Sequence, residues 1–178
     1  MRDVLLAGVI AAAEGVEGRV KLQKMIYLLQ RMGYRLGFDD FILLHYGPYS
    51  ADLANTVDLA STGVLNETTH TGGPAGSPII QYVYDVRPEI REVVDRVLHA
   101  TFRDRGDDLC RRSAEMSRRN ARVLEVAATA VYLRDEMGIS DEDRLWREVK
   151  GRKSHLAKHF DKAKNLLADW DARGLLRR

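Results

Sequence analysis

The sequence has little of what a disulfide-stapled, metal-clustered or membrane-embedded protein requires. It contains one cysteine, Cys110, which excludes an internal disulfide and a cluster of zinc-bound thiolates. No apolar run approaches the roughly 20 residues of a membrane-spanning helix. The apolar stretch from Val4 to Ala13 is followed by Glu14 and Glu17 without a convincing small-residue cleavage site, so we interpret it as a helix and not as a signal peptide. We therefore expect a cytoplasmic protein without a membrane partner.

A strong excess of one charge is also lacking. The 178 residues include 28 Lys and Arg against 26 Asp and Glu, and a formal net charge of +2 does not by itself require a nucleic-acid partner. Apolar residues make up 45% of the chain, which is enough for a folded core and excludes wholesale disorder. The charge is unevenly placed, because residues 64–86 contain no Lys or Arg whereas residues 87–178 carry a net charge of +5.

The most basic stretch covers residues 144–164, where eight basic residues stand against two acidic ones. Two interpretations remain open for it: a solvated helical face, or an anion-binding surface. In the second case the phosphate contacts of a bound nucleic acid would come from Arg144, Arg147, Lys150, Arg152, Lys153 and Lys158.

Hydrophobic periodicity predicts three helices in the first third of the chain, at residues 2–13, 19–32 and 48–61. In the second of these, one buried stripe recurs at helical spacing, which leaves the intervening Lys and Gln residues largely on the other faces. Pro48 suits the first position of the third helix. Residues 41–46 are short and continuously apolar, which favours a buried strand or extended segment.

Strands are predicted at residues 64–69 and 79–86, joined by a hairpin tip rich in glycine and proline at 71–78. Only helices follow. One begins at Pro88, a break is expected at 103–108, and another helix is expected at 121–137. Two more helices follow, the first capped by Ser140 with Asp143 three residues on. The last carries a seam for another helix, inside the chain or across a homodimer, formed by Leu156, Phe160, Ala163, Leu167 and Trp170.

The order of three helices and a two-stranded hairpin is typical of a winged helix. We therefore predict a mostly helical fold in which residues 1–86 form a winged-helix-like unit, with the hairpin as its wing. Residues 87–178 are expected to form a helical region that packs with it as one compact unit.

One segment, residues 19–65, carries a more specific pattern. It contains Lys21-Leu22-Gln23-Lys24, then Tyr27, and later Tyr46-Gly47-Pro48-Tyr49-Ser50 before a helix that ends near Gly63. This pattern resembles the YwgA-like bacterial family and the related Panacea, or SocA-like, antitoxin domain. The resemblance implies a protein that acts by contact with a protein partner, such as a toxin or a regulatory protein, and the long helical C-terminal half departs from the shorter Panacea form.

The two motifs in this segment leave alternatives open. Lys21, Gln23 and Lys24 are either solvated around an inward-packing Leu22 or in contact with a partner's acidic surface or a phosphate. The Tyr-Gly-Pro-Tyr element is either an architectural entry into a helix or part of a readable helix face. The candidate partner-binding residues are Lys21, Gln23, Lys24, Tyr27, Tyr49, Ser50 and Asn55.

Base readout by the third helix is disfavoured because Asp52 and Asp58 would approach phosphates, and the wing offers no Lys or Arg. His155 and His159 are four residues apart, a spacing that can bind a metal on one helix face, but they lack a recognised zinc pattern. Cys110 lies beside Arg111 and has no histidine near it in sequence. We therefore expect no enzyme, no metal and no cofactor.

The expected function is a non-enzymatic bacterial adaptor, regulatory or antitoxin-like, that binds a protein partner. The alternative is a nucleic-acid-binding protein that uses the basic residues of the C-terminal half, and a third hypothesis is an enzyme that uses a metal at His155 and His159.

Overall fold

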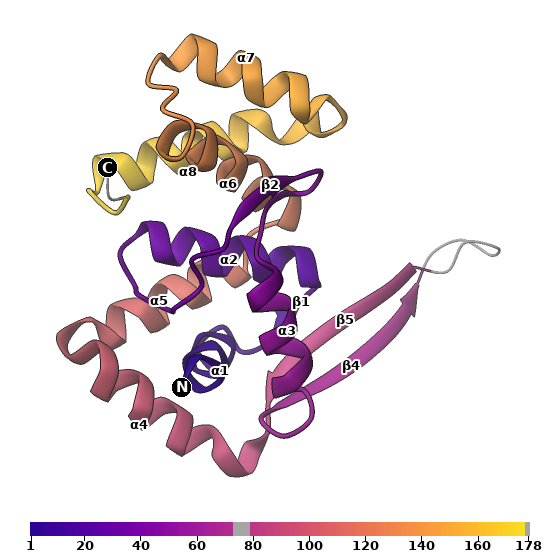
Figure 1. Ribbon diagram of the computed structural model, residues 1–178, viewed down its shortest axis with the longest axis vertical. Coiled ribbons are helices and arrows are strands. Elements are labelled where there is room, and N and C mark those ends of the chain that lie inside the picture. Colours follow the sequence, from indigo (N-terminus) through magenta and orange to yellow (C-terminus); the bar gives the residue numbers. More distant parts are fainter. Residues whose placement is uncertain (73–78, 177–178) are drawn as a thin grey trace.

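The computed structural model describes residues 1–72 and 79–176, and it is mostly helical with a small antiparallel sheet, as the sequence predicts (Figure 1). The helices are α1 (Arg2–Ala12), α2 (Arg19–Arg31), α3 (Ala51–Ala60), α4 (Arg91–Phe102), α5 (Gly106–Ser117), α6 (Ala121–Asp135), α7 (Glu142–Arg152) and α8 (Phe160–Ala172). Short 3-10 helices cover Pro88–Ile90, Arg103–Arg105 and Ser154–His159. The strands are β1 (Val16–Glu17), β2 (Ile42–Leu44), β3 (Gly47–Tyr49), β4 (Leu65–Gly72) and β5 (Ile79–Val86).

The strands form two separate antiparallel pairings. β4 and β5 make a long hairpin that projects from the helices, and the short strand β1, which sequence patterns did not predict, adds to the other edge of β5 (Figure 1). β2 and β3 form a small hairpin of their own, with Leu43 opposite Pro48. Most of the predicted hairpin tip at residues 71–78 lies outside the described residues.

Helix α1 occupies the centre of the lower half of the molecule, against α4, α5 and β5 (Figure 1). Residues Leu5 to Ile10 are all buried, because neighbours surround the helix on every side. Gly8 permits the close approach of α4, since a Cβ atom there would lie 2.4 Å from Cδ1 of Leu98. Along the described chain, no helix has both the length and the apolar character needed to cross a membrane.

Helix α2 connects the group of helices that contains α1, α4 and α5 with the group that contains α6, α7 and α8, because it packs against α5 on one side and α6 on another. Its residues Leu22 to Leu29 are all buried, including the polar ones. α6 is apolar along most of its length and also carries α7 and α8. One continuous hydrophobic core therefore contains side chains from both halves of the sequence.

The segment before α3 differs from its prediction. Residues 41–46 do contain a short strand, β2, but Ile42 and Leu44 are 55% and 47% exposed instead of buried. The third helix begins at Ala51 and not at Pro48, because Pro48 lies in β3 and the side chain of Ser50 caps the helix by accepting a hydrogen bond from the backbone N–H of Leu53.

The C-terminal half contains one helix that sequence patterns missed and three details that they misplaced. α5 was not predicted, and the break at 103–108 is limited to the Arg103–Arg105 turn. Asp141, and not Ser140, caps α7. Val93, which helical spacing would place in one buried stripe of α4 with Val94 and Leu98, is 49% exposed. The seam of α8 is buried inside the chain, with Phe160 and Trp170 packed in the core, so it gives no support for a homodimer.

Candidate functional site

The site begins with the Lys-Leu-Gln-Lys motif in the first turns of α2. The helical spacing that turns Leu22 into the core also turns Gln23 and Lys24 toward the segment before α3, and both are buried. Of the two interpretations left open for this motif, solvation does not apply to Lys24, which is 1% exposed. Lys21 is half-buried and donates a hydrogen bond to the backbone carbonyl of Ser117, at the end of α5.

Gln23 fixes the start of α3 through its side-chain amide. Its Nε2 atom donates to the carbonyl oxygen of Ser50 at 2.9 Å, and its Oε1 atom accepts from the N–H of Ser50 at the same distance. Ser50 Oγ also donates to Asp40. These bonds satisfy both backbone groups of Ser50 and hold the exit of the β2–β3 hairpin against α2.

Lys24 binds strand β3 of the β2–β3 hairpin through its side-chain amine. Its Nζ atom donates to the carbonyl oxygen of Pro48 at 2.6 Å. Gly47 has a φ of +86° and lies against α6, where a Cβ atom would come within 2.9 Å of Thr129 Oγ1 and 3.3 Å of Lys24 Cε. A side chain at this position would therefore be strained by its backbone and blocked by its neighbours.

A buried ion pair supports the same hairpin from α6. Glu125 is fully buried, and its Oε1 atom accepts from Lys153 Nζ at 2.7 Å while its Oε2 atom accepts from Arg122 at 3.0 Å. Lys153 also donates to the backbone carbonyl of His45. We call Lys24, Glu125 and Lys153 the buried clasp, because together they tie the hairpin to α2, α6 and the end of α7.

Burial dominates the electrostatics of Lys24. It lowers the pKa of Lys24 to about 7, although Glu125 acts in the opposite direction, and Lys153 lowers it further. Near neutral pH the Lys24 amine is therefore poised between its charged and neutral forms, both of which can donate to the Pro48 carbonyl.

An apolar groove of about 280 Å³ lies between α2, α3 and the β2–β3 hairpin. Leu22 and Leu53 are buried beneath it, and its rim includes Leu44 and Tyr46, which are 47% and 51% exposed. The described residues that line the groove are Arg19, Val20, Leu22, Gln23, Lys24, Leu44, Tyr46, Gly47, Tyr49, Leu53, Ala54 and Val57. Most of these side chains are aliphatic or aromatic, and the Lys24 amine is bound to the Pro48 carbonyl, so the lining suits the binding of an apolar group.

The structure places the predicted partner-binding residues in two groups. Tyr27 and Ser50, like Gln23 and Lys24, are buried, so they shape the site from inside. Tyr49 is half-buried and lines the groove, and Asn55 is exposed on α3. Sequence reasoning missed Leu44, Ala54 and Glu125. Glu125 carried a signal, because it is the one charged residue within the apolar run from Val123 to Val131.

The basic residues proposed for nucleic-acid binding are also divided. Arg144, Arg147, Lys150 and Lys158 are exposed, and Arg152 is paired with Glu148. The expectation that Lys153 offers a phosphate contact is at odds with its position, because its side chain is 1% exposed and bound to Glu125.

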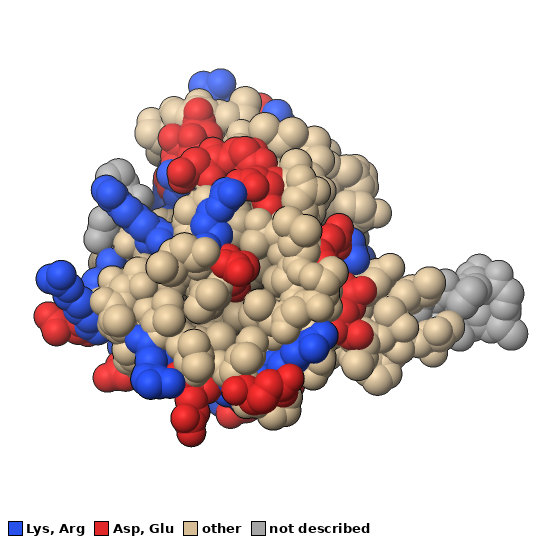
Figure 2. All heavy atoms as spheres, turned by 60° about the horizontal axis from the view of Figure 1, so that its bottom comes forward, with Lys and Arg blue, Asp and Glu red and all other residues tan. Residues whose placement is uncertain are grey.

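Other predicted features find a different place in three dimensions. Figure 2 shows Lys and Arg interspersed with Asp and Glu on the face drawn, and the projecting hairpin is largely without charge up to its undescribed end.

His155 and His159 lie in a 3-10 helix with a non-helical Leu156 between them, so they do not share one α-helical face. The His155 ring stacks on that of His45 instead, with 5.7 Å between centroids.

These observations define a mostly helical protein with a small antiparallel sheet and an apolar groove braced by buried polar contacts. No family model matches the chain. The chain is similar to the uncharacterized protein YwgA of Bacillus subtilis (strain 168), with 26% identity over 159 residues and coverage of 82% of each protein.

Proposed function

We propose that this chain is a non-enzymatic bacterial adaptor, regulatory or antitoxin-like, that holds an apolar segment of a protein partner in the groove between α2, α3 and the β2–β3 hairpin. The observation that carries the proposal is the groove itself, with Leu44 and Tyr46 exposed at its rim. Apolar rims around a pocket are typical of places where a partner inserts an anchoring side chain.

A protein segment suits the groove better than a small molecule because apolar surface continues beyond it. Ile42 precedes the rim residue Leu44 by two positions in β2, which places both on the same face of the strand, and Ile42 is 55% exposed. A small ligand is usually enclosed, whereas a peptide segment in extended or helical form also covers apolar residues on either side of its anchor.

The proposal includes a finer view of the fold. Residues 1–86 form a winged-helix-like unit in which β4 and β5 are the wing, and this unit is related to the Panacea antitoxin domain. The order of α1, α2, α3 and the hairpin supports this view. Gln23 and Lys24 then contribute by holding the hairpin that forms one wall of the groove, and Tyr49 and Asn55 are the residues left to meet the partner, a toxin or a regulatory protein.

A pair of matched variants tests the proposal. Leu44→Asp places a charge on the rim, and Val93→Asp places one on an apolar residue of α4 with nearly the same exposure, 49% against 47%. Partners recovered from the native host with the wild-type chain are quantified by mass spectrometry, and the candidate partner is then purified and titrated. We expect Leu44→Asp to weaken that binding at least tenfold and Val93→Asp to leave it unchanged. Equal binding by both variants, or no specific partner for the wild type, contradicts the proposal.

Nucleic-acid binding is the second candidate function, and the exposure of four basic side chains on α7 and the following turn favours it. In that case affinity falls steeply with salt, and Arg144→Ala with Lys150→Ala weakens binding. A gel shift that detects no complex at about 50 mM salt removes this candidate.

A further inference from the structure

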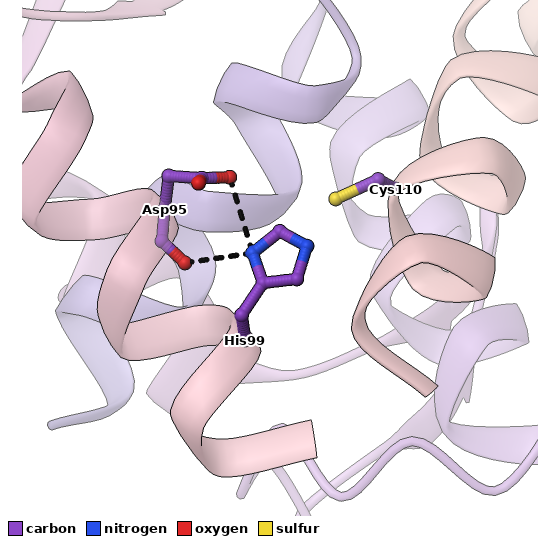
Figure 3. A group of neighbouring side chains, drawn as sticks. All are labelled: Asp95, His99 and Cys110. Atoms are coloured by element: carbon purple, nitrogen blue, oxygen red, sulfur yellow. Dashed lines mark hydrogen bonds and ion pairs between the residues drawn. The ribbon is translucent and has the colours of Figure 1, made fainter. Parts of the chain in front are cut away.

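A group of metal-binding side chains lies away from the groove, between α4 and α5. Asp95 and His99 are separated by one helical turn on α4, which places both on the face that meets α5. Cys110, the single cysteine, points toward them from α5 (Figure 3). One ligand atom of each residue lies within 4.8 Å of the other two.

We propose that Asp95, His99 and Cys110 form a binding site for a divalent transition metal ion, with Zn²⁺ as the favoured occupant. Oxygen, imidazole nitrogen and thiolate sulfur together suit Zn²⁺ better than Mg²⁺ or Ca²⁺, which take oxygen ligands. Tetrahedral zinc with bonds of about 2.0–2.3 Å places its ligand atoms about 3.3–3.8 Å apart. The ligand atoms therefore need to approach one another by about an ångström. Rotation of the exposed Asp95 side chain supplies part of this approach, and His99 and Cys110 close the rest by small changes of their side-chain torsions.

The surroundings orient the imidazole for this role. His99 Nδ1 lies 3.3 Å from the Asp95 carboxylate, and Nε2 lies 3.1 Å from Oδ1 of Asp107. An ion bound beside Asp95 takes Nδ1, which then gives up its 2.9 Å hydrogen bond to the backbone carbonyl of Asp95. The N–H at Nε2 is left to the Asp107 carboxylate, the kind of acceptor that is usual for histidines that bind metals.

The first residue of α5, Gly106, lies in close contact with His99. Gly106 begins that helix, and a Cβ atom there would lie 2.6 Å from Cδ2 and 3.2 Å from Cα of His99. Only glycine allows this contact, which brings the start of α5 onto the imidazole and Cys110 into reach one turn later. A single thiolate in a mixed set of ligands is compatible with the one-cysteine composition, which excludes only sites built from several thiolates.

The consequence of metal binding is a link between α4 and α5 across the Arg103–Arg105 turn. Neither helix lines the apolar groove, so this site does not depend on the function proposed for the groove. Its direct effect is to stabilise the packing of the two helices, because an ion bound only by the folded chain stabilises it.

Cobalt titration of the chelator-treated full chain tests the site. Co²⁺ replaces Zn²⁺ in such sites, and a bound thiolate gives a charge-transfer band in the near ultraviolet. We expect this band to saturate at one Co²⁺ per chain and to disappear on addition of Zn²⁺. A wild-type chain that shows no such band overturns the proposal, and that result does not depend on the folding of any variant.

Three variants assign the ligands. Cys110→Ser is expected to lose the band and His99→Ala to weaken binding at least tenfold. The double variant His155→Ala and His159→Ala removes two histidines of the Ser154–His159 segment, away from this site. It is expected to bind Co²⁺ as the wild type does. Circular dichroism checks that each variant is folded. Binding that survives in Cys110→Ser and is lost in the double histidine variant contradicts the assignment.

Discussion

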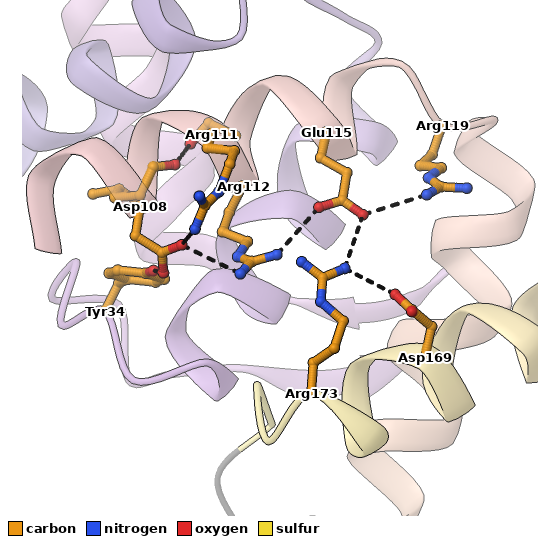
Figure 4. Close-up of polar contacts among 10 residues, drawn as sticks. Tyr34, Asp108, Arg111, Arg112, Glu115, Arg119, Asp169 and Arg173 are labelled. Atoms are coloured by element: carbon orange, nitrogen blue, oxygen red, sulfur yellow. Dashed lines mark hydrogen bonds and ion pairs between the residues drawn. The ribbon is translucent and has the colours of Figure 1, made fainter.

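Two groups of paired charges hold the helices of this chain together, and they differ in how much water reaches them. In the buried clasp, Glu125 and Lys153 are 0% and 1% exposed and 2.7 Å apart. In the α5–α8 network, Arg112, Glu115 and Arg173 join α5 to the end of α8, with Asp108 and Asp169 at the two ends (Figure 4). Of these, Arg112 is 6% exposed, but it contacts both Asp108 and Glu115, which are 30% and 23% exposed, and Arg173 is 40% exposed.

The comparison shows that the loss of one charged partner has different consequences in an exposed network and in a buried one. Water and salt weaken the attraction between charges in the α5–α8 network, and other ion pairs there can replace one that is lost. The clasp has no such reserve, because a buried charge that loses its partner cannot be solvated. The clasp also lies beneath the hairpin that forms one wall of the groove, so its integrity sets the shape of the candidate site.

The largest effect is expected from Glu125→Gln. This change keeps the shape of the side chain but leaves Lys153 as a buried charge without its carboxylate partner, which costs about 3–5 kcal/mol of unfolding free energy. Urea denaturation followed by circular dichroism measures the loss. A loss below about 1 kcal/mol would mean that the clasp behaves like a surface pair.

Gly47→Ala tests the close approach of the hairpin to the clasp. The alanine would have a φ of +86° and a Cβ atom 2.9 Å from Thr129 Oγ1, so we expect a loss of about 2–4 kcal/mol. Gly18→Ala is the control, because Gly18 has a φ of +94° but nothing within 4 Å of the added Cβ atom. Its loss should be about 1–2 kcal/mol, and equal losses would exclude a contribution from crowding at Gly47.

The pH dependence of stability sharpens the comparison through Lys24. The pKa of Lys24 is about 7 in the folded chain and 10.5 for an ordinary lysine, so between these values the unfolded chain binds a proton that the folded chain does not. The unfolding free energy should therefore rise as the pH increases from 7 toward 10, and Lys24 should contribute up to about 1 kcal/mol per pH unit to this rise. Below pH 6, Lys24 should make no contribution to the pH dependence.

Lys24→Met is the control for that measurement. Its unfolding free energy, measured across the same pH range, should lack the part of the slope that Lys24 supplies. Identical slopes in the wild type and the variant would mean that Lys24 keeps an ordinary pKa.

The smallest effect is expected from Glu115→Gln, the counterpart of Glu125→Gln in the α5–α8 network. Glu115 contacts Arg112, Arg119 and Arg173, but solvent reaches it, so we expect a loss of at most about 1 kcal/mol that shrinks further with added salt. A loss as large as that of Glu125→Gln would remove the distinction between the two groups.

Much of the helical framework follows from sequence periodicity. α1, α2, α4 and α6 were predicted within a few residues, because each has an apolar repeat of helical spacing or a continuous apolar run. α5 was missed because Asp107, Asp108, Arg111 and Arg112 make it read as a polar segment, although Leu109 and Met116 are buried. Arg112 is buried on the same helix as Leu109 and Met116, and a search for apolar residues at helical spacing does not count an arginine as part of a buried face.

The candidate site was predictable only in part. The Lys-Leu-Gln-Lys and Tyr-Gly-Pro-Tyr motifs do meet, but periodicity placed Lys24 in solvent, because it assumes one buried face for each helix. α2 has neighbours on several sides, and this follows from contacts between residues distant in sequence. The pairing of Glu125 with Lys153 has the same origin, since 28 residues separate them.

The central claim is that the apolar groove binds a protein partner, and site-specific photocrosslinking tests it most directly. A photoreactive phenylalanine derivative replaces Ala54, which lines the groove, or Val93, which lies on α4 outside it. After irradiation in the native host, we predict one defined crosslinked partner from position 54 and none from position 93. The same partner from both positions, or no crosslink from position 54, would contradict the account.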